Sequence, residues 1–421
     1  SSRRRHTRFK CDWSSDVCSS DLYEGLSELF EFRVEALSKD GDIDFNQALG
    51  RTCCVTQKGY KGVDRHFDGV LVEAQALGSV QDLYAYRLVL RPKLWLLSRT
   101  TNCRIWHDKN ALDIIKELLG DRGVDYKSSV QRTPRTREYS VQYRESDLAF
   151  VSRLMEDEGI YYFHEFSDGK HTLVLADGPS SHQPVPNLAN LRFSSVSASG
   201  QLREQALYEW MAERRFRSGK FELRDYNFKT PGNKLVGPAS ASASYEKGQM
   251  EVYDYPGKYD LDSEGKTYAE IRRDAEQAID QRRYASGEAP SLLPGGIVTI
   301  EKHPKNSENN RYLVVRCTHN FSTQLYRSGG AALGAGENYR GTYEFQLADR
   351  VFRAPIVTPK PLVYGPQTAK VVNRPGGSGE EIDVDEHGRI RVRFHWDRDD
   401  KRSCWVRVAQ MWSGEIGRAH V

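Results

Sequence analysis

Apolar and polar residues alternate along most of this chain. The alternation is clearest in residues 29–38, 65–78, 83–92 and 311–321. A period of two places every second side chain on the same face, so each stretch predicts a β-strand with one buried face. Pro92 cannot donate to a strand ladder and marks the expected end of the third strand.

Two further stretches repeat their apolar residues with the period of an α-helix. Residues 110–123 begin with Asn110, a favourable N-cap, and end near Gly120 or Gly123. The apolar stripe of this helix is expected to consist of Leu112, Ile115, Leu118 and Leu119. Residues 268–287 carry the longest helical pattern of the chain.

A third helix is predicted immediately after Ser146, which is a second favourable N-cap. Gly159 is expected to end it, and residues 160–176 then form a hairpin across a turn at 167–169. The buried face of this helix is expected to consist of Leu148, Val151, Leu154 and Met155.

The C-terminal part predicts a separate small β unit. Prolines in residues 354–372 indicate a linker, and residues 380–396 predict two strands joined by a turn at 385–388. The apolar residues of the last strands share one face, which a small antiparallel barrel would bury. Its expected core residues are Ile390, Val392, Phe394, Trp396, Val406 and Val408. The expected residues of the charged outer face are Arg389, Arg391 and Arg393.

Both ends of the chain resemble translated sequencing adapters. Residues 11–22 and 416–421 each match one adapter in a single reading frame, so we exclude residues 1–22 and 416–421 from the expected fold. The natural chain is then expected to extend beyond both ends. No signal peptide or membrane-length apolar stretch is evident.

The charge balance argues against a dedicated nucleic-acid binder. The whole chain has a net charge of +3, and without the adapter-like ends its basic and acidic residues are equal in number. Proteins that bind nucleic acid through phosphates normally carry a basic excess. The five cysteines outside those ends are widely spread and form no CxxC pair, which favours reduced core cysteines over a zinc site.

Several short patterns imitate catalytic or ligand-binding motifs. Residues 264–267 lack the upstream glycine of a phosphate-binding loop, and residues 380–388 do not have the spacing of a calcium loop. The carboxylates at 156–158 indicate a solvated helix end. His164 and His171 are expected to be neighbours in the hairpin but lack further metal ligands. We therefore expect no catalytic, cofactor or metal residues.

Four segments together resemble the VgrG family of type VI secretion spike proteins. They are residues 23–38, 137–166, 251–259 and 385–414. The resemblance implies a mainly β fold with some α (α+β), with two phage-hub-like barrels and helical insertions before a partial OB-fold barrel. It divides the chain into an adapter-like tail (1–22), a first hub region (23–185), a second hub region (186–353), an incomplete OB domain (354–415) and a second adapter-like tail (416–421).

The resemblance also implies a non-enzymatic role. Family members form homotrimers that cap a hexameric inner tube, carry a spike-cap protein and effectors through a C-terminal part, and puncture target membranes. They assemble in the bacterial cytoplasm and leave through the type VI apparatus. The outer-face arginines are then expected to pair with carboxylates such as Glu380, Glu381, Asp397, Asp399 and Asp400, within the chain or across the trimer.

Three other functions remain open from the sequence. A phage or tailocin tail hub would share the fold and the symmetry of a secretion spike. An OB-fold nucleic-acid binder would place aromatic residues beside the arginines on one groove face. The chain could also be the carrier part of a protein with a C-terminal effector enzyme.

Overall fold

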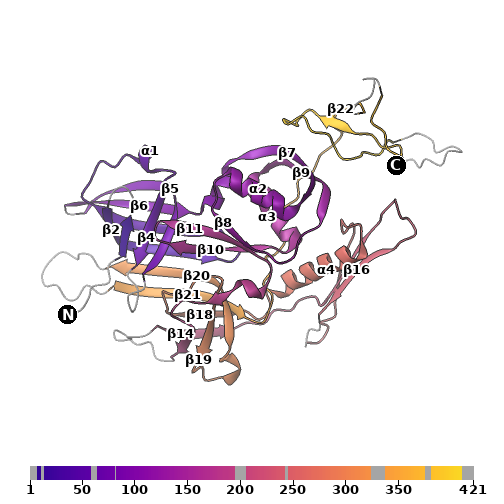
Figure 1. Ribbon diagram of the computed structural model, residues 1–421. Helices are drawn as coiled ribbons and strands as arrows, with labels where there is room; N and C mark the ends of the chain where they lie inside the picture. The colour runs from indigo at the N-terminus through magenta and orange to yellow at the C-terminus, as the bar shows by residue number, and fades with distance from the viewer. Residues whose placement is uncertain are drawn as a thin grey trace. The chain divides into compact units, whose positions relative to one another are not determined.

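The computed structural model describes residues 7–10, 14–57, 64–80, 82–194, 205–241, 245–323, 337–374 and 381–409 (Figure 1). The chain divides into two compact units. The first comprises Ser1–Leu96, Leu119–Arg132 and Met155–Val357, and the second comprises Leu97–Leu118, Thr133–Leu154 and Thr358–Val421. The described residues are mainly strands with few helices, which confirms the mainly β prediction.

Six strands of the first unit pair into a closed ring. They are β1 (Thr7–Lys10), β4 (Thr52–Gln57), β5 (Arg65–Val80), β6 (Leu83–Arg91), β3 (Glu31–Ser38) and β2 (Ser14–Gly25), and β2 pairs again with β1. A short helix, α1 (Phe45–Ala48), follows β3. Apolar side chains such as Phe32, Val55 and Leu88 form one buried cluster in this barrel. Closure leaves the ring without a free strand edge.

The predicted strand pairs are present, and β6 ends just before Pro92 as expected. Excluding residues 14–22 from the fold was wrong, however. They form most of β2, where Val17 and Leu22 are buried and where β3 and β20 (Arg311–Thr323) pair on either side. A bulge between Val17 and Ser19 shifts the register of this segment against β3, and polar residues surround its two buried apolar ones, so local alternation did not reveal the strand.

A second set of six strands also closes on itself. Its members in order are β20, β21 (Glu337–Leu347), β18 (Arg283–Glu288), β14 (Ala206–Ala212), β13 (Asn190–Phe193) and β19 (Gly296–Glu301), and β19 pairs again with β20. β12 (Gln183–Pro184) extends β19. The pairing of β2 with β20 joins both sets into one 13-stranded sheet. The helix predicted over 268–287 is wrong at its end, because residues 283–288 pair as a strand with β14 and β21.

The hairpin predicted at 160–176 is confirmed. β10 (Tyr161–Ser167) pairs with β11 (Lys170–Ala176) across a turn in which Gly169 has a φ of +71°, and β8 (Tyr126–Ser129) extends the sheet. In the same unit, α4 (Asp262–Gln277) packs on β15 (Lys220–Asp225) and β16 (Leu235–Ser240), with β17 (Glu251–Asp254) beside β15. Residues 264–267 lie inside α4, so they form no phosphate-binding loop.

In the second unit, β7 (Thr101–Asn110) pairs with β9 (Thr136–Ser146), and each strand leads directly into a helix. Asn110 accepts a hydrogen bond from the backbone of Asp113 (2.9 Å) at α2 (Ala111–Asp121), and Ser146 accepts one from Ala149 (3.1 Å) at α3 (Asp147–Glu158). Both predicted N-caps are therefore confirmed. The predicted apolar face of α3 needs one correction, since Phe150 is fully buried and Leu148 only half-buried.

The remaining elements are short. β22 (Ala369–Val371) and β23 (Val392–Phe394) form a two-stranded sheet, and 3-10 helices occupy Lys93–Arg99, Pro179–Ser181 and Asn306–Glu308. No helix among the described residues has the length and apolar character needed to cross a membrane.

Two chemical expectations from the sequence are corrected by burial and bonding. The carboxylates at the end of α3 do not form a solvated face, since Glu156 is 8% and Glu158 1% exposed. Glu158 pairs with Arg132 at 2.6 Å, so a cation compensates its burial. Cys53 is disulfide-bonded, whereas the sequence favoured a reduced core cysteine at this position.

Candidate interaction surfaces

The Arg389–Trp396 segment lies in the small sheet of the second unit. Val392, Arg393 and Phe394 form β23, which pairs with β22, whereas Ile390 makes single bridges to Val384 and Val406. The turn at 385–388 is confirmed, since Asp385 accepts backbone hydrogen bonds from His387 (3.0 Å) and Arg389 (2.8 Å). β23 pairs with the linker residues of β22, a partner that the sequence did not predict.

The six expected core residues differ in their burial. Val392 is buried, with 9% of its surface exposed, whereas Ile390, Phe394, Trp396 and Val406 are half-buried. Val408 is 42% exposed, which differs from its expected core position. In the part of the chain that the structure describes, the strands around Val392 do not close into a ring, so no second wall covers the whole apolar face.

The three expected outer-face arginines each have a partner. Arg389 pairs with Asp385 at 2.6 Å, and Arg393 pairs with Asp400 at 2.8 Å. The Arg391 guanidinium lies 4.2 Å from the ring centre of Trp405, within the range of a cation–π contact. Among the proposed carboxylate partners, Glu381 pairs with Arg374 and Asp399 with Lys401, while Glu380 lies outside the described residues.

The aromatic residues of this segment are engaged within the unit. Phe394 and Trp396 stack at 4.9 Å, and Trp396 lies 5.4 Å from the ring of Tyr143. The indole N–H of Trp396 donates to Gln367 at 3.2 Å. A protein that binds single-stranded nucleic acid instead presents its aromatic rings to the bases.

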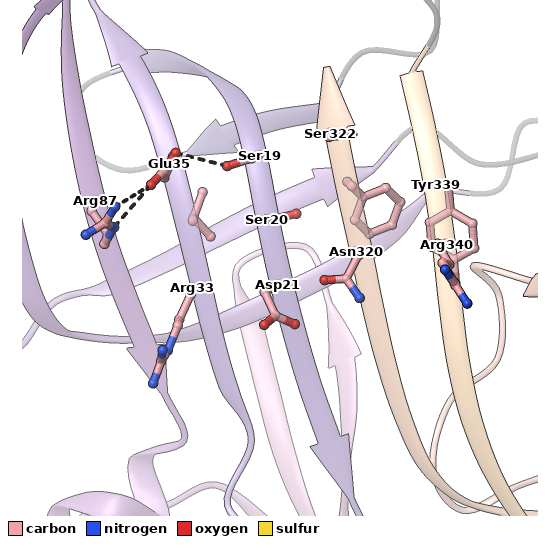
Figure 2. A pocket seen from close by; sticks show the side chains of 12 residues that line it. Ser19, Ser20, Asp21, Arg33, Glu35, Arg87, Asn320, Ser322, Tyr339 and Arg340 are labelled. Carbon is pink, nitrogen blue, oxygen red and sulfur yellow. Dashed lines mark hydrogen bonds and ion pairs between the residues drawn. The ribbon is translucent and has the colours of Figure 1, made fainter. Parts of the chain in front are cut away.

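An open groove crosses the 13-stranded sheet where the two closed sets of strands meet (Figure 2). Its charged and polar side chains come from neighbouring strands. Glu35 pairs with Arg87 at 2.7 Å and accepts a hydrogen bond from Ser19 at 3.1 Å. The lining residues are Ser19, Ser20, Asp21, Arg33, Val34, Glu35, Arg87, Asn320, Phe321, Ser322, Tyr339 and Arg340.

A buried polar chain connects the same two sets of strands. Glu24 on β2 pairs with Arg65 on β5 and lies 3.5 Å from Nε2 of the fully buried His319 on β20. The other ring nitrogen of His319 lies 2.7 Å from the Tyr339 hydroxyl, which lies 2.7 Å from that of Tyr343.

Burial sets the protonation of this polar chain. It lowers the pKa of His319 and raises the pKa of Tyr343, which keeps both groups neutral. A side chain at Gly341 would overlap the Tyr343 hydroxyl, so glycine is required there. Sequence reasoning missed these residues, although His319 and Glu24 were visible as polar groups at apolar positions of alternating strands.

The two hairpin histidines have structural roles. His171 accepts a hydrogen bond from the Lys93 backbone at 2.9 Å, and its Nδ1 lies 2.6 Å from the buried carboxylate of Asp68. The ring of His164 is packed edge-on against Phe30 at 4.9 Å and lies 6.1 Å from that of His171. Burial holds the pKa of His164 well below its ordinary value, so this ring is neutral.

Comparison with known proteins places these features in a family. The model of the phage tail baseplate hub (GPD) family matches residues 23–325. The type VI secretion system spike protein VgrG1b of Pseudomonas aeruginosa is 37% identical over 98% of this chain and 56% of that protein. VgrG1a of the same organism is 33% identical over 98% of this chain and 64% of that protein. The chain thus spans a little over half the length of these relatives.

Solved structures share the fold at low sequence identity. An E. coli component of the type VI secretion system, described as similar to the phage T4 tail proteins gp27 and gp5, has a TM-score of 0.67. It is 19% identical and the match covers 96% of this chain and 93% of that one. A 43 kDa prophage tail protein from Shewanella oneidensis has a TM-score of 0.57 at 10% identity, over 83% of this chain and all of that one. The chain belongs to the phage tail baseplate hub family and, within it, to the VgrG spike proteins of type VI secretion.

Proposed function

We propose that this chain is the hub and the start of the OB-fold domain of a homotrimeric secretion spike that caps a hexameric inner tube. The observation that carries the proposal is the pair of six-stranded closed sets, each built from one half of the chain and joined through β2 and β20. Residues 23–185, preceded by β1 and the first part of β2, and residues 186–353 would be the two hub regions. Residues 354–415 would be the incomplete OB domain, with Ile390, Val392, Phe394, Trp396 and Val406 toward its core.

The symmetry argument is geometric. Three copies of a chain with two similar barrels present six barrels, which can match a six-fold tube although the spike has only three chains. A repeated head-to-tail contact between copies closes into such a ring. The buried polar chain from Arg65 to Tyr343, which crosses from β2 to β20, would hold the two barrels of each copy together.

A structural spike that caps a tube needs no active site. In this proposal the chain binds no cofactor and performs no chemistry. A spike-cap protein and effectors would attach through the C-terminal part that the longer relatives possess, and membrane puncture and secretion from the cytoplasm would be functions of the complete assembly. A VgrG protein has been solved in complex with PdpA, which supports the idea that such spikes carry other proteins.

A tail hub of a phage or tailocin is the second candidate, favoured by the family match over residues 23–325. Genes for a sheath and secretion baseplate beside this one would favour secretion, and genes for a capsid would favour a phage. The neutral charge balance and the internal partners of Arg391 and Trp396 argue against the nucleic-acid alternative.

The tube contact can be tested with a hybrid protein. The hybrid joins this chain to the C-terminal remainder of the Pseudomonas VgrG1b and is mixed with tubes assembled from the inner tube protein. Electron microscopy should show it at tube ends and not along tube walls, while the C-terminal remainder alone should not bind. Tube ends without hybrid at saturating protein would contradict the proposal.

A further inference from the structure

Three potential metal ligands meet on the outside of the first barrel. Cys53 and Val55 belong to its buried cluster, so Cys54 and Thr56 lie on the opposite face of β4. His66 is the cross-strand partner of Thr56 on β5, and Asp168 lies in the turn between β10 and β11. The hairpin turn therefore comes close to the outer barrel wall at these side chains.

The ligand atoms are close to coordination geometry. The Cys54 sulfur lies 4.0 Å from Nδ1 of His66, and one ligand atom from each of Cys54, His66 and Asp168 lies within 4.8 Å of the others. Thiolate, imidazole and carboxylate ligands around a tetrahedral zinc are about 3.3–3.6 Å apart, given bond lengths of about 2.0–2.3 Å. Asp168 is exposed in a turn, so side-chain rotation can close much of the difference.

An independent observation also favours a cation here. Asp68 is the cross-strand partner of Cys54 and is fully buried. Its Oδ1 lies beside His171, but its Oδ2 has no hydrogen-bond partner among the described residues. His171 accepts a hydrogen bond from the Lys93 backbone at Nε2, and its Nδ1 lies beside Oδ1 of Asp68, so His171 leaves Oδ2 without a partner. A buried carboxylate oxygen without a partner is costly, and a cation bound next to Cys54 would lower that cost.

The same three residues could be read as a nucleophile with its base. Burial of the thiol raises the pKa of Cys54, however, which keeps it protonated and unreactive. On binding, a metal ion would displace the thiol proton into solvent and coordinate the resulting Cys54 thiolate.

We propose that Cys54, His66 and Asp168 bind a divalent ion of the zinc class, with a fourth position open to water, and that the ion fastens the β10–β11 hairpin to the barrel wall. One thiolate with one imidazole and one carboxylate suits zinc better than calcium or magnesium, which prefer oxygen ligands alone. The three ligands come from separate segments of the chain, so the bond would join elements that are distant in sequence.

Cobalt(II) is the probe for this site, because a thiolate ligand gives Co²⁺ a charge-transfer band in the near ultraviolet. The full chain, stripped with a chelator, should bind one equivalent of Co²⁺ with this band, and zinc should displace it. Cys54→Ser should abolish the band. His66→Ala and Asp168→Asn should each weaken binding by more than about tenfold, since even residues that only support ligands contribute that much.

Controls at other positions keep the test specific. Cys103→Ser and His303→Ala remove a free cysteine and a half-buried histidine away from the site, and both should leave the titration unchanged. Absence of the band in the unaltered chain, or its persistence in Cys54→Ser, would overturn the proposal. Unchanged Co²⁺ affinity in His66→Ala would also overturn the proposal, because the ion would then bind without the His66 imidazole. His66 is half-buried, so its replacement by alanine should leave the core of the barrel folded.

Discussion

Replacing Phe32 with alanine is expected to lower the free energy of unfolding of the first barrel by about 3–5 kcal/mol. Phe32 is fully buried, stacks on Phe30 at 4.4 Å and meets Phe67 edge-on at 5.3 Å. Truncation removes these contacts and leaves a cavity in a closed barrel that cannot collapse easily. Hydrogen exchange of the β3 amides under mild denaturant measures the loss in this barrel separately from the rest of the chain.

Phe216→Ala is the matched control, because it deletes the same side chain at a position that is 55% exposed. It is expected to change the free energy of unfolding by no more than about 1 kcal/mol. Equal effects of the two substitutions would mean that Phe32 is not in the closed core described above.

Replacing Glu308 with alanine is expected to lower the stability of the second set of strands by about 3–5 kcal/mol, because it leaves the buried Arg283 without its counter-ion. Glu308 is 3% exposed and accepts hydrogen bonds from Arg283 (2.6 Å), Trp210 (3.1 Å) and Tyr312 (3.2 Å). Denaturation followed by Trp fluorescence measures the loss. Lys305→Ala is the control, since Lys305 is 69% exposed and 3.8 Å from Glu308, and it should cost less than about 1 kcal/mol.

The Glu308 effect should also depend on pH. Burial alone would raise the pKa of Glu308, but hydrogen bonds from Arg283 and Trp210 more than offset it and hold the pKa below its ordinary value of 4.5. A carboxylate with a lowered pKa contributes stability above its unfolded pKa, and that stability is lost as the pH falls through the folded pKa. The difference in the free energy of unfolding between the unaltered chain and Glu308→Ala should therefore shrink in acid. A difference that grew in acid would contradict this ion pair.

Local patterns predicted the local structure well. Alternation located β3, β5 and β6 of the first barrel, and Asn110 and Ser146 located two helix starts, because each signal depends on neighbouring residues only. The end of α4 was wrong because the apolar and charged residues of 283–288 fit either a helix or a strand, and pairing with β14 and β21 decides between them.

Non-local features could not be derived in this way. Closure of each set of strands depends on pairings such as β1 with β2 and β19 with β20, which no local pattern encodes. The ion pair of Glu158 with Arg132 and the meeting of Cys54, His66 and Asp168 likewise join residues from separate segments. The position of Val408 outside a core reflects strands that do not close in the described part of the second unit.

The family assignment came from long ordered segments rather than from any catalytic motif. The arginines at 389–393 were expected to pair with carboxylates such as Asp400, and Arg393 does pair with Asp400. Arg389 instead pairs with Asp385, and Arg391 lies over the ring of Trp405. Arginines paired within the chain suit a rigid homotrimeric spike better than a groove that binds a polyanion, because a polyanion-binding groove needs free cations.

The mass of the completed protein in solution is the most direct test of the proposed homotrimer. The hybrid of this chain with the C-terminal remainder of VgrG1b is purified and its mass is determined by light scattering during size-exclusion chromatography. The account predicts a particle of three chains that keeps this mass on dilution. A particle containing a single chain would contradict it.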